Sequence, residues 1–463
     1  MAILVWKGMA LMNVTIVGCG YVGLTTGVTL AFTGHRVTGV EIDEKKLHLL
    51  KNHQSPIHEQ GLESLLQAVE NRLQFTSDIK EASGQADIII IAVGTPSKSN
   101  GEADLQYVEA AAAEIAGGLL AGRNYTIVVK STVPIGTNYR VASVVRRVLH
   151  ATNVNTYVSF GSNPEFLREG MALVDAFYPD RIVIGSDSET AIESLRRLYR
   201  PILEQTFSPP LCCPRPQNYS LPPLVTTNTF SSEMIKYAAN AFLALKISFI
   251  NEIAGLCEKV GADVTEVARG IGLDPRIGPR FLQAGIGWGG SCFPKDTAAL
   301  ISLGNEYQYT MPIIEAIRMV NVRQRRLIIE KLQSFLKVLR GRTIGILGLA
   351  FKPGTDDVRD SPAVEIIRML AETGSHVRAC DPVAVSNARN LLKNMEVEFH
   401  EDPYSLADGC DALVLLTEWN VFESLDFAKI ATIMHSPYIL DGRNFLNRDD
   451  ILQAGLVYEG VGR

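Results

Sequence analysis

The sequence has little of what a disulfide-stapled, membrane-spanning or nucleic-acid-binding protein needs. Its seven cysteines are an odd number scattered over 463 residues, which excludes a disulfide framework and favours a reducing compartment. Apolar runs such as IIIIAV at 88–93 are far shorter than the roughly 18 residues of a membrane span. The net charge of −6 offers no basic surface for nucleic acid or an anionic membrane. We therefore expect a soluble, cytoplasmic protein without either partner.

The composition is that of a folded globular protein. Hydrophobic residues make up 46% and charged residues 20% of the chain, which excludes disorder, and the length suggests about three domains, or two large ones. The first residues, MAILVWKGMAL, resemble a signal peptide only faintly, since no basic region precedes the apolar stretch. We interpret 1–12 as an N-terminal extension before an internal start at Met12.

The N-terminal half shows a repeating strand and helix pattern. The segment from Asn13 to Gly34 is a β-branched strand, a glycine turn and a helix that ends at its glycine, and HRVTGVE follows as a second strand ending in Glu41. The apolar run ADIIIIAVGTP at 86–96 is typical of a parallel strand covered on both faces. The pattern predicts a βαβ region.

The same order of elements returns in the C-terminal half. RTIGILGLAFKPG at 342–354 precedes a helix that ends at Gly374, SHVRACD ends in Asp381, and CDALVLLTEW at 410–419 reads as a further buried strand. The fold class predicted is therefore α/β, with two Rossmann-like, doubly wound parallel-sheet domains.

A long helix is predicted between the two halves. From about Ser231 to Val260 the sequence has helical apolar spacing and no proline, and Gly261 supplies the stop. At about 1.5 Å per residue such a helix is longer than one domain needs, so we expect it to bridge domains and subunits. The domain prediction is an extension at 1–12, a first Rossmann-like domain at 13–224, a helical domain at 225–335 and a second Rossmann-like domain at 336–463.

Two segments are interpreted without chemistry. SPPLCCPRPQNYSLPP at 208–223 has six prolines in sixteen residues and can form neither helix nor central strand, so we expect an exposed loop. Its adjacent Cys212 and Cys213 have no further ligands at metal spacing. Arg323, Arg325 and Arg326, on a later helical stretch, are expected to form a solvated face.

The first glycine turn has the spacing of a dinucleotide-binding fingerprint. In GCGYVG, Gly18, Gly20 and Gly23 follow a strand and precede a helix, which lets the backbone approach a pyrophosphate at the positive helix N-terminus. Glu41, at the end of the second strand, can bond ribose hydroxyls and would repel a 2′-phosphate, which favours NAD over NADP. Lys46 can reach a diphosphate or the adenosine ribose, although a surface lysine is the commoner case.

The C-terminal half lacks this fingerprint. It has GILGLAFKPG where the glycines of a dinucleotide turn would stand, so it should hold a different nucleotide. Lys352, Arg359 and Arg443 supply positive charge at predicted strand ends, where α/β sheets place ligands. Any one of them alone would more often be a surface residue.

FLQAGIGWGGSCFPKD, from Phe281 to Asp296, is the most informative stretch. Glycines near Cys292 let a substrate approach the sulfur, and Pro294 suits the first turn of a following helix. A thiol at a helix N-terminus beside Lys295 should have a lowered pKa. Most cysteines are simply buried, but these surroundings favour a nucleophile.

Four further polar residues complete a candidate catalytic set. Lys236 and Asn240 lie four apart on the long helix and share a face, although a helical lysine is usually just solvated. Glu165 in NPEFLREG and Thr132 in KSTVPIGT stand just beyond predicted strands, where a parallel sheet presents its ligand-binding edge.

Taken together these motifs resemble the nucleotide-sugar 6-dehydrogenase family. The resemblance extends from Asn13 to about Gly455 and includes GCGYVGL, VGTP, KSTVPIGT, NPEFLREG, the MIKYAANAFLALKISFINE helix, GWGGSCFPKD, GLAFKPGTDDVRDSPA and DGRNF. The proline-rich loop departs from the family, which has a shorter connection there, and Glu41 stands where many members carry Asp. The resemblance implies an NAD-binding domain at 13–224, a helical dimerisation domain at 225–335 and a UDP-sugar-binding domain at 336–463.

The activity implied is the four-electron oxidation of UDP-glucose to UDP-glucuronate with two NAD, through a Cys292 thiohemiacetal and thioester. Lys236 and Asn240 would stabilise the oxyanion, and Asp296 and Glu165, with Thr132, would transfer protons. The implied cofactor contacts are Gly18, Gly20, Tyr21, Val22, Gly23, Glu41, Lys46, Thr95, Thr132, Glu165, Lys295 and Arg359. The implied substrate contacts are Glu165, Phe166, Leu167, Lys236, Asn240, Arg276 (from across the dimer), Phe281, Gly289, Phe351, Lys352 and Arg443. No metal is expected, and a homodimer or higher homo-oligomer is.

Three other functions stay open at this point. The same catalytic groups would serve a 6-dehydrogenase of GDP-mannose or of a UDP-N-acetylhexosamine. A hydroxyacid dehydrogenase also joins a Rossmann domain to a helical one, but needs neither Cys292 nor the C-terminal domain. A non-catalytic nucleotide-sugar sensor would have no use for Cys292, Lys236 and Asp296.

Overall fold

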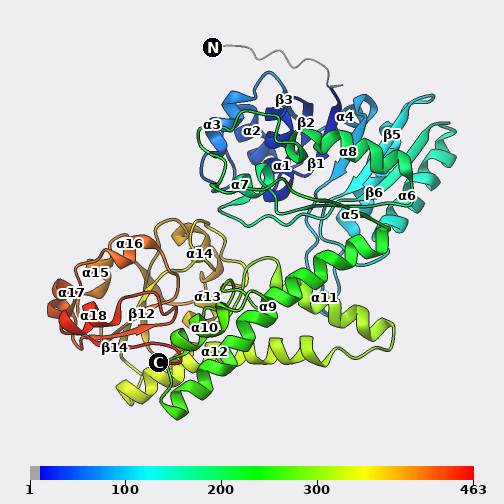
Figure 1. Cartoon of the computed structure of the whole chain (residues 1–463). Coiled ribbons are helices and arrows are strands. Elements are labelled where there is room, and N and C mark those ends of the chain that lie inside the picture. The colour runs from blue at the N-terminus through cyan, green and yellow to red at the C-terminus, as the bar shows by residue number, and fades with distance from the viewer. Residues whose placement is uncertain (1–10) are drawn as a thin grey trace. The chain divides into compact units, whose positions relative to one another are not determined.

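The computed structural model describes residues 11–463, which form two compact units (Figure 1). The first ends at Ala238 and the second runs Ala239–Arg463, so that the boundary falls within helix α9 (Thr229–Val260). The extension expected at 1–12 lies outside the described residues except for its last two positions, of which Met12 is buried. The four-segment domain division stays a prediction.

The first unit is built on an eight-stranded sheet in the order β3-β2-β1-β4-β5-β6-β7-β8. Its registered pairs are parallel except for β6 with β7, which is antiparallel. Its strands are β1 (Asn13–Val17), β2 (Arg36–Val40), β3 (Leu73–Thr76), β4 (Ile88–Ile91), β5 (Asn124–Val129), β6 (Tyr157–Ser162), β7 (Ile182–Gly185) and β8 (Leu224–Thr227).

Helices cover both faces of this sheet (Figure 1). In β4, Ile88 and Ile90 belong to one core cluster and Ile89 and Ile91 to the other, because successive strand residues point to opposite faces. That is why the strand is apolar throughout. The helices are α1 (Tyr21–Phe32), α2 (Glu44–Lys51), α3 (Leu62–Ala68), α4 (Ile79–Gln85), α5 (Gln106–Gly118), α6 (Thr137–Thr152), α7 (Ala172–Phe177) and α8 (Glu189–Leu203).

The second unit contains a parallel six-stranded sheet in the order β11-β10-β9-β12-β13-β14. The order turns back between β9 and β12, as it does between β1 and β4 in the first sheet, and ligands of such folds bind beyond the strand carboxyl ends at this switch point. The strands are β9 (Thr343–Leu347), β10 (His376–Cys380), β11 (Val397–Phe399), β12 (Ala412–Leu415), β13 (Tyr438–Asp441) and β14 (Val457–Glu459).

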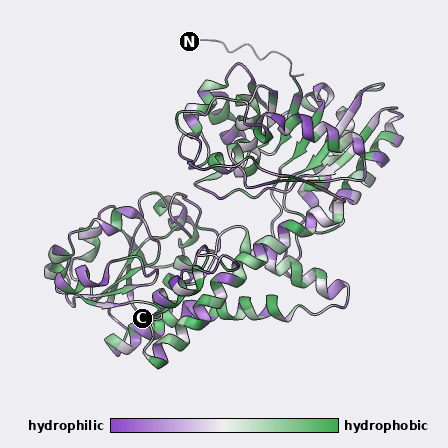
Figure 2. Ribbon diagram, viewed as in Figure 1, coloured by the Kyte–Doolittle hydropathy of each residue, from purple (hydrophilic) through white to green (hydrophobic). Residues whose placement is uncertain are grey.

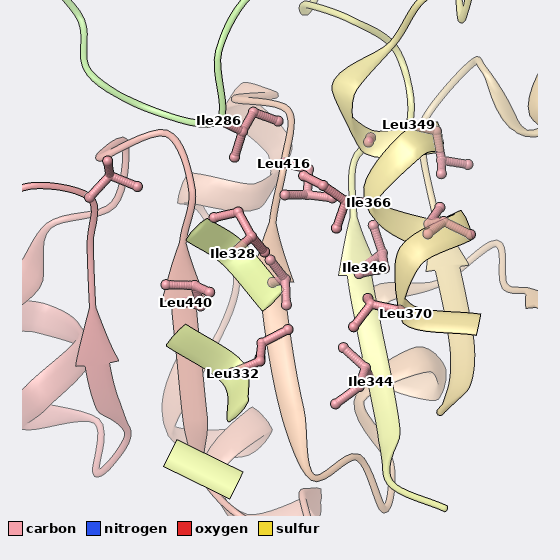
Figure 3. Close-up of a cluster of buried hydrophobic side chains, with 14 of the residues drawn as sticks. Ile286, Ile328, Leu332, Ile344, Ile346, Leu349, Ile366, Leu370, Leu416 and Leu440 are labelled. Carbon is pink, nitrogen blue, oxygen red and sulfur yellow. The ribbon is translucent and has the colours of Figure 1, made fainter. Parts of the chain in front are cut away.

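Long helices pack on this second sheet. Figure 3 shows Ile328 and Leu332 of α12 together with Ile366 of α13 and the β9 residues Ile344 and Ile346, all fully buried. Figure 2 shows the same concentration of hydrophobic residues along the strands of both sheets. The helices are α10 (Val264–Gly272), α11 (Phe293–Glu306), α12 (Pro312–Leu336), α13 (Pro362–Glu372), α14 (Val385–Leu391), α15 (Pro403–Ala407), α16 (Asn420–Glu423), α17 (Phe427–Ile433) and α18 (Arg448–Gln453).

The predicted fold class is confirmed. Helices α1 and α13 end two residues before Gly34 and Gly374, which take positive φ of 113° and 81°. The long helix runs over 32 residues and stops at Gly261, with φ of 75°. Only its start differs from the expected one, because the helix begins two residues earlier, at Thr229.

Two expectations were wrong in part. The 208–223 segment is a loop as predicted, but it is not simply exposed: Cys213 is buried in the core of the first unit, and Tyr178 Oη donates a hydrogen bond of 2.9 Å to its carbonyl. Arg325 is also buried, and it donates to the Trp288 carbonyl at 3.1 Å and contacts Glu365. It therefore anchors a loop instead of facing solvent with Arg323.

Helix α9 has the length and apolar composition of a membrane-crossing helix, although the sequence contains only short uninterrupted apolar runs. Core helices of soluble proteins share both properties, and 44% of its most apolar window is buried within the protein. It also carries buried polar residues such as Glu233 and Lys236.

One buried lysine joins three elements of the second unit. Lys331 of α12 pairs with Glu258 of α9 at 2.7 Å and with Glu459 of β14 at 2.9 Å. Burial opposes its charge, but the two glutamates outweigh burial and raise the pKa of Lys331. The contribution of this group to stability is therefore present below the ordinary lysine pKa and lost as pH rises through the raised one.

We expect Lys331→Met to lower the free energy of unfolding by about 3–5 kcal/mol at pH 7, because two carboxylates lose their buried counter-charge. Denaturant unfolding measures the change. The exposed Lys259→Met serves as control and should alter it by less than about 0.5 kcal/mol. Equal effects of the two substitutions would contradict the role of Lys331.

Candidate active site

The first glycine turn is shaped for close approach of a ligand. Gly18 has φ of 97°, and a Cβ on Gly23 would lie 1.8 Å from the Gly18 carbonyl oxygen, so neither position accepts a side chain. A Cβ on Gly20 would meet no protein atom within 4 Å. Gly20 is also the N-cap of α1 and provides no side-chain cap, which leaves space and amide donors where a pyrophosphate would sit.

The other predicted cofactor residues of the first unit surround the ends of its strands. Glu41 directly follows β2, is 8% exposed and accepts a hydrogen bond of 2.9 Å from the Asp43 amide. Lys46 is exposed on α2, whereas Thr95 is buried and its hydroxyl donates to the Thr132 carbonyl at 2.8 Å. Tyr21 and Val22 open α1. The residues present fit NAD.

A buried ion pair lies in the first unit. Lys236 Nζ of α9 is 2.8 Å from Glu165 Oε1, and both side chains are 5% exposed. Glu165 follows β6, and its Oε2 accepts from the Leu167 amide at 2.5 Å. The ring of Phe166 lies 5.4 Å from the Lys236 ammonium and 3.7 Å from the Arg181 guanidinium. The structure thus brings predicted Lys236, Glu165, Phe166 and Leu167 together.

Burial alone would raise the pKa of Glu165, but Lys236, the Leu167 amide and Lys130 together lower it below the usual range. The carboxylate therefore stays ionised near neutral pH. An ionised, positioned carboxylate can accept a proton or orient a water molecule.

The matching arrangement in the second unit involves Asn240, one helical turn beyond Lys236 on α9. Asn240 Nδ2 donates to Asp296 Oδ2 at 2.6 Å, and Asp296 is fully buried and also contacts Lys295. Cys292 is the N-cap of α11, half-buried, with the Ser291 hydroxyl 3.6 Å from its sulfur. Asp296 lies one turn beyond Cys292, and its amide donates to the Cys292 carbonyl at 2.8 Å.

Polar side chains hold the loop before Cys292 from several elements. The Gly285 amide donates to Asn251 of α9 at 2.8 Å, and the Trp288 amide donates to Asn321 of α12 at 2.7 Å. Arg443, just beyond β13, donates to the Gly287 carbonyl at 3.4 Å. The loop that carries the thiol is therefore fixed to the long helices and to the carboxyl edge of the second sheet.

Three predicted substrate residues of the second unit, Phe351, Lys352 and Arg443, lie together at this edge. Arg443 also donates to the Phe351 carbonyl at 3.1 Å, and the Lys352 ammonium lies 5.4 Å from the Phe351 ring. A Cβ on Gly289 would lie 2.2 Å from the Asp360 carbonyl oxygen. Phe281, at a positive φ of 65°, packs its ring 6.5 Å from that of Phe293.

Two predicted residues are placed differently. Arg276 is mostly exposed and pairs with Asp274 at 2.6 Å, and Arg359 pairs with Asp357 at 2.7 Å. Each points its guanidinium at a carboxylate two positions back in the chain. Their expected ligand contacts stay predictions.

In the second sheet, a carboxylate of the protein itself binds the backbone of the glycine turn. Asp381 follows β10, as Glu41 follows β2, but its Oδ2 accepts from the Leu349 and Ala350 amides at 2.7 and 3.1 Å. A carboxylate thus takes amides that a phosphate would need, which explains physically why the dinucleotide fingerprint is missing there.

Sequence reasoning missed three buried residues that hold the site of the first unit. Glu59 accepts from the Gly170 and Leu173 amides at 2.8 and 3.2 Å, just after the Glu165 segment. Glu233 of α9 accepts from the amides of Gly136 and Asn138 at the start of α6. Lys130, beside Thr132, is the third. The sequence did offer a signal for Lys130, because it is a charged residue at the end of an otherwise apolar strand.

Seven cysteines fall within the described residues, and all are free thiols. Over the same residues, no group of three or more His, Cys, Asp or Glu side chains could hold a metal ion.

The sequence matches three domains of one family. The NAD binding domain of the UDP-glucose/GDP-mannose dehydrogenase family matches residues 12–203, its central domain 230–323 and its UDP binding domain 345–448. Together with the site geometry, these matches show that the chain belongs to the UDP-glucose/GDP-mannose dehydrogenase family.

Individual relatives span nearly the whole chain. UDP-glucose 6-dehydrogenase TuaD of Bacillus subtilis is 45% identical over 454 residues, covering 97% of this chain and 93% of the relative. The solved UDP-glucose dehydrogenase of Pyrobaculum islandicum is 39% identical with a TM-score of 0.87, covering 99% of each chain. The UDP-D-ManNAc dehydrogenase of Pyrococcus horikoshii is 26% identical with a TM-score of 0.82, covering 98% of this chain and 99% of that one.

The family predicted from the motifs is confirmed, and so is NAD as the cofactor. The chain is an NAD-dependent oxidoreductase of this family.

The glycine turn gives a matched pair of variants. We expect Gly20→Ala to fold normally but to raise the KM for NAD at least about 10-fold, since its methyl group would enter the open space beside α1. Gly23→Ala should instead lower the unfolding free energy by about 3 kcal/mol, since it forces a backbone shift. Thermal unfolding and NAD titration separate the two. Normal NAD binding by Gly20→Ala would place the pyrophosphate elsewhere.

Proposed function

We propose that this protein oxidises UDP-glucose to UDP-glucuronate, using two NAD and one water per sugar. The observation that carries the proposal is Cys292, a half-buried thiol at the N-terminus of α11, one turn from buried Asp296. An alcohol dehydrogenase that stops at the aldehyde needs no such nucleophile. NAD, when bound, accepts one hydride, so the four electrons of the full oxidation require two cofactor molecules.

In the first oxidation, a base takes the C6 hydroxyl proton while hydride leaves C6. Asp296 and Glu165 are the candidate bases, and Lys236 and Asn240 supply the donors that stabilise the oxyanion. Lys236 and Asn240 lie a single turn apart on α9. Thr132 helps to hold water.

In the second oxidation, the Cys292 sulfur adds to the aldehyde carbon and forms a thiohemiacetal, which keeps the aldehyde from escaping. Hydride leaves the same carbon and a proton leaves the hydroxyl, which gives a thioester. Water then adds, the carbon–sulfur bond breaks, and the carboxylate departs while the thiol is restored. Gly290, two residues before the thiol, has a positive φ of 83°, and a Cβ there would lie 2.7 Å from the Phe351 ring, so this turn of the loop requires glycine.

UDP-glucose is favoured over other nucleotide sugars by the naming of the relatives. Those named for UDP-glucose share 39–46% of their residues with this chain, against 26% for the UDP-D-ManNAc enzyme. Phe351, Lys352 and Arg443 would contact the nucleotide or sugar, with Phe281 and Gly289 beside them. GDP-mannose or a UDP-N-acetylhexosamine remains the alternative substrate.

The proposed assembly is a homodimer or a larger homo-oligomer. Phe242, Phe249 and Leu256 recur every seven residues on α9 and are 60%, 47% and 58% exposed, so one face of the helix is apolar and uncovered. We propose that a second copy covers it, which would make α9 an interface helix and not a membrane span. The seven free thiols support a reducing, cytoplasmic location.

The decisive assay supplies NAD with UDP-glucose and counts NADH formed per sugar consumed. Two NADH per UDP-glucose are expected. Cys292→Ala should abolish net formation of the acid while NAD and UDP-glucose still bind, as calorimetry would show. One NADH per sugar, or uronate made by the variant at the normal rate, would overturn the thioester route, and GDP-mannose and UDP-N-acetylglucosamine run in parallel identify a different substrate.

The assembly is tested by the double substitution of Phe242 and Phe249 with Asp. We expect the dimer dissociation constant to rise by roughly 100-fold or more, since two buried aromatic anchors are lost. Sedimentation velocity measures the shift to monomer. Leu211→Asp changes a fully exposed apolar residue of the 208–223 loop and serves as control. An assembly unchanged by the double substitution would place the interface elsewhere.

A further inference from the structure

Lys130 is a buried charged residue to which the reaction above gives no role. It directly follows β5 and is 7% exposed. Within residues 11–463 it forms no ion pair of its own. Its ammonium donates to Asn163 Oδ1 at 2.9 Å and approaches Tyr199 Oη at 3.5 Å, so both direct partners are neutral.

These partners are themselves fixed. The Asn163 Oδ1 also accepts from Tyr199 Oη at 2.6 Å, and the Asn163 Nδ2 donates to the Val183 carbonyl at 2.8 Å. Asn163 stands two residues before Glu165, on the same segment beyond β6. The network therefore fixes the Lys130 ammonium against the segment that carries Glu165.

Several charged groups face this region. Lys236 from α9 pairs with Glu165, Lys130 comes from the end of β5, and Arg181 before β7 stacks on Phe166. The Glu165 carboxylate raises the pKa of Lys130 and the Lys236 ammonium lowers it. The buried cluster of Lys130, Lys236 and Glu165 thus contains two ammonium groups for one carboxylate, an excess of positive charge.

We propose that Lys130 is a positioning residue of the reaction, a second buried ammonium that keeps Glu165 ionised while Lys236 is engaged with the substrate. When Lys236 turns its donor toward an oxyanion, Glu165 loses part of its counter-charge in a site where an unpaired charge is costly. Lys130 supplies that charge without touching the sugar. The inference rests on the proposed function of Glu165 and adds a residue to it.

The titration behaviour of both groups agrees with this geometry. Burial lowers the pKa of Lys130 to about 8, with Glu165 opposing the shift and Lys236 adding to it. At neutral pH Lys130 is therefore mostly charged, and its removal should raise the pKa of Glu165.

The first test is the pH profile of Lys130→Met. We expect the acid limb of kcat to move up by about one pH unit, with the KM for UDP-glucose changed less than about 2-fold. Asn163→Asp, which neutralises Lys130 within the network, should move the limb in the same direction. Tyr199→Phe removes a hydrogen bond but no charge and should leave the limb in place. The proposal would be overturned if the acid limb of the kcat profile stayed in place in both Lys130→Met and Asn163→Asp. It would also be overturned if Tyr199→Phe moved that limb by the same amount.

A second test needs no activity. A double-substitution cycle of Lys130→Met and Glu165→Gln, read by denaturant unfolding, measures the coupling of the two charges. Lys130→Met should cost more stability when Glu165 is present than when it is Gln. Additive effects would contradict the coupling, even if UDP-glucose proves not to be the substrate, so the cycle distinguishes failure of this inference from failure of the proposed function.

Discussion

Two buried carboxylates depend on one helix. Lys236 and Asn240, a single turn apart on α9, bind Glu165 at 2.8 Å and Asp296 at 2.6 Å. A buried carboxylate without a partner costs several kcal/mol, so α9 cannot slip or rotate by one residue without losing both contacts. These contacts act together with others that α9 makes, among them Glu233 with the Gly136 amide and Asn251 with the Gly285 amide.

The position of the thiol follows from a second constraint. Backbone amides of the loop before Cys292 are bound by Asn251 and Asn321, side chains of two long helices, while Arg443 connects the loop to the end of β13. Where the loop passes other backbone closely, at Gly289, only glycine fits. The sulfur is thus held at a helix N-terminus by a loop that several elements fix.

The sequence predicts local features of this protein well. Gly34 and Gly374 mark the ends of α1 and α13, the β4 run shows two-sided burial, and Gly18, Gly20 and Gly23 occupy the turn for which their spacing is typical. Each is decided by residues close together in the chain, where steric and periodic rules act directly.

Long-range pairings could not be predicted in this way. Arg325 looked like a surface residue because the partner that buries it, Trp288, lies 37 positions away. Lys130 and Asn163 form a hydrogen bond from the ends of two neighbouring strands, β5 and β6. Cys213 is buried in a core to which residues far away in the chain contribute. Asp381 resembles Glu41 in sequence, yet it binds its own glycine turn. Such contacts depend on the order of the strands in the sheet, which cannot be predicted from local sequence patterns.

The covalent step at the thiol can be observed directly. Enzyme turning over UDP-glucose and NAD is quenched in acid within milliseconds, digested and analysed by mass spectrometry. The peptide that contains Cys292 should carry the mass of the sugar nucleotide bound through sulfur, and the adduct should disappear once substrate is exhausted. An active enzyme whose Cys292 peptide stays unmodified at every quench time would contradict the account.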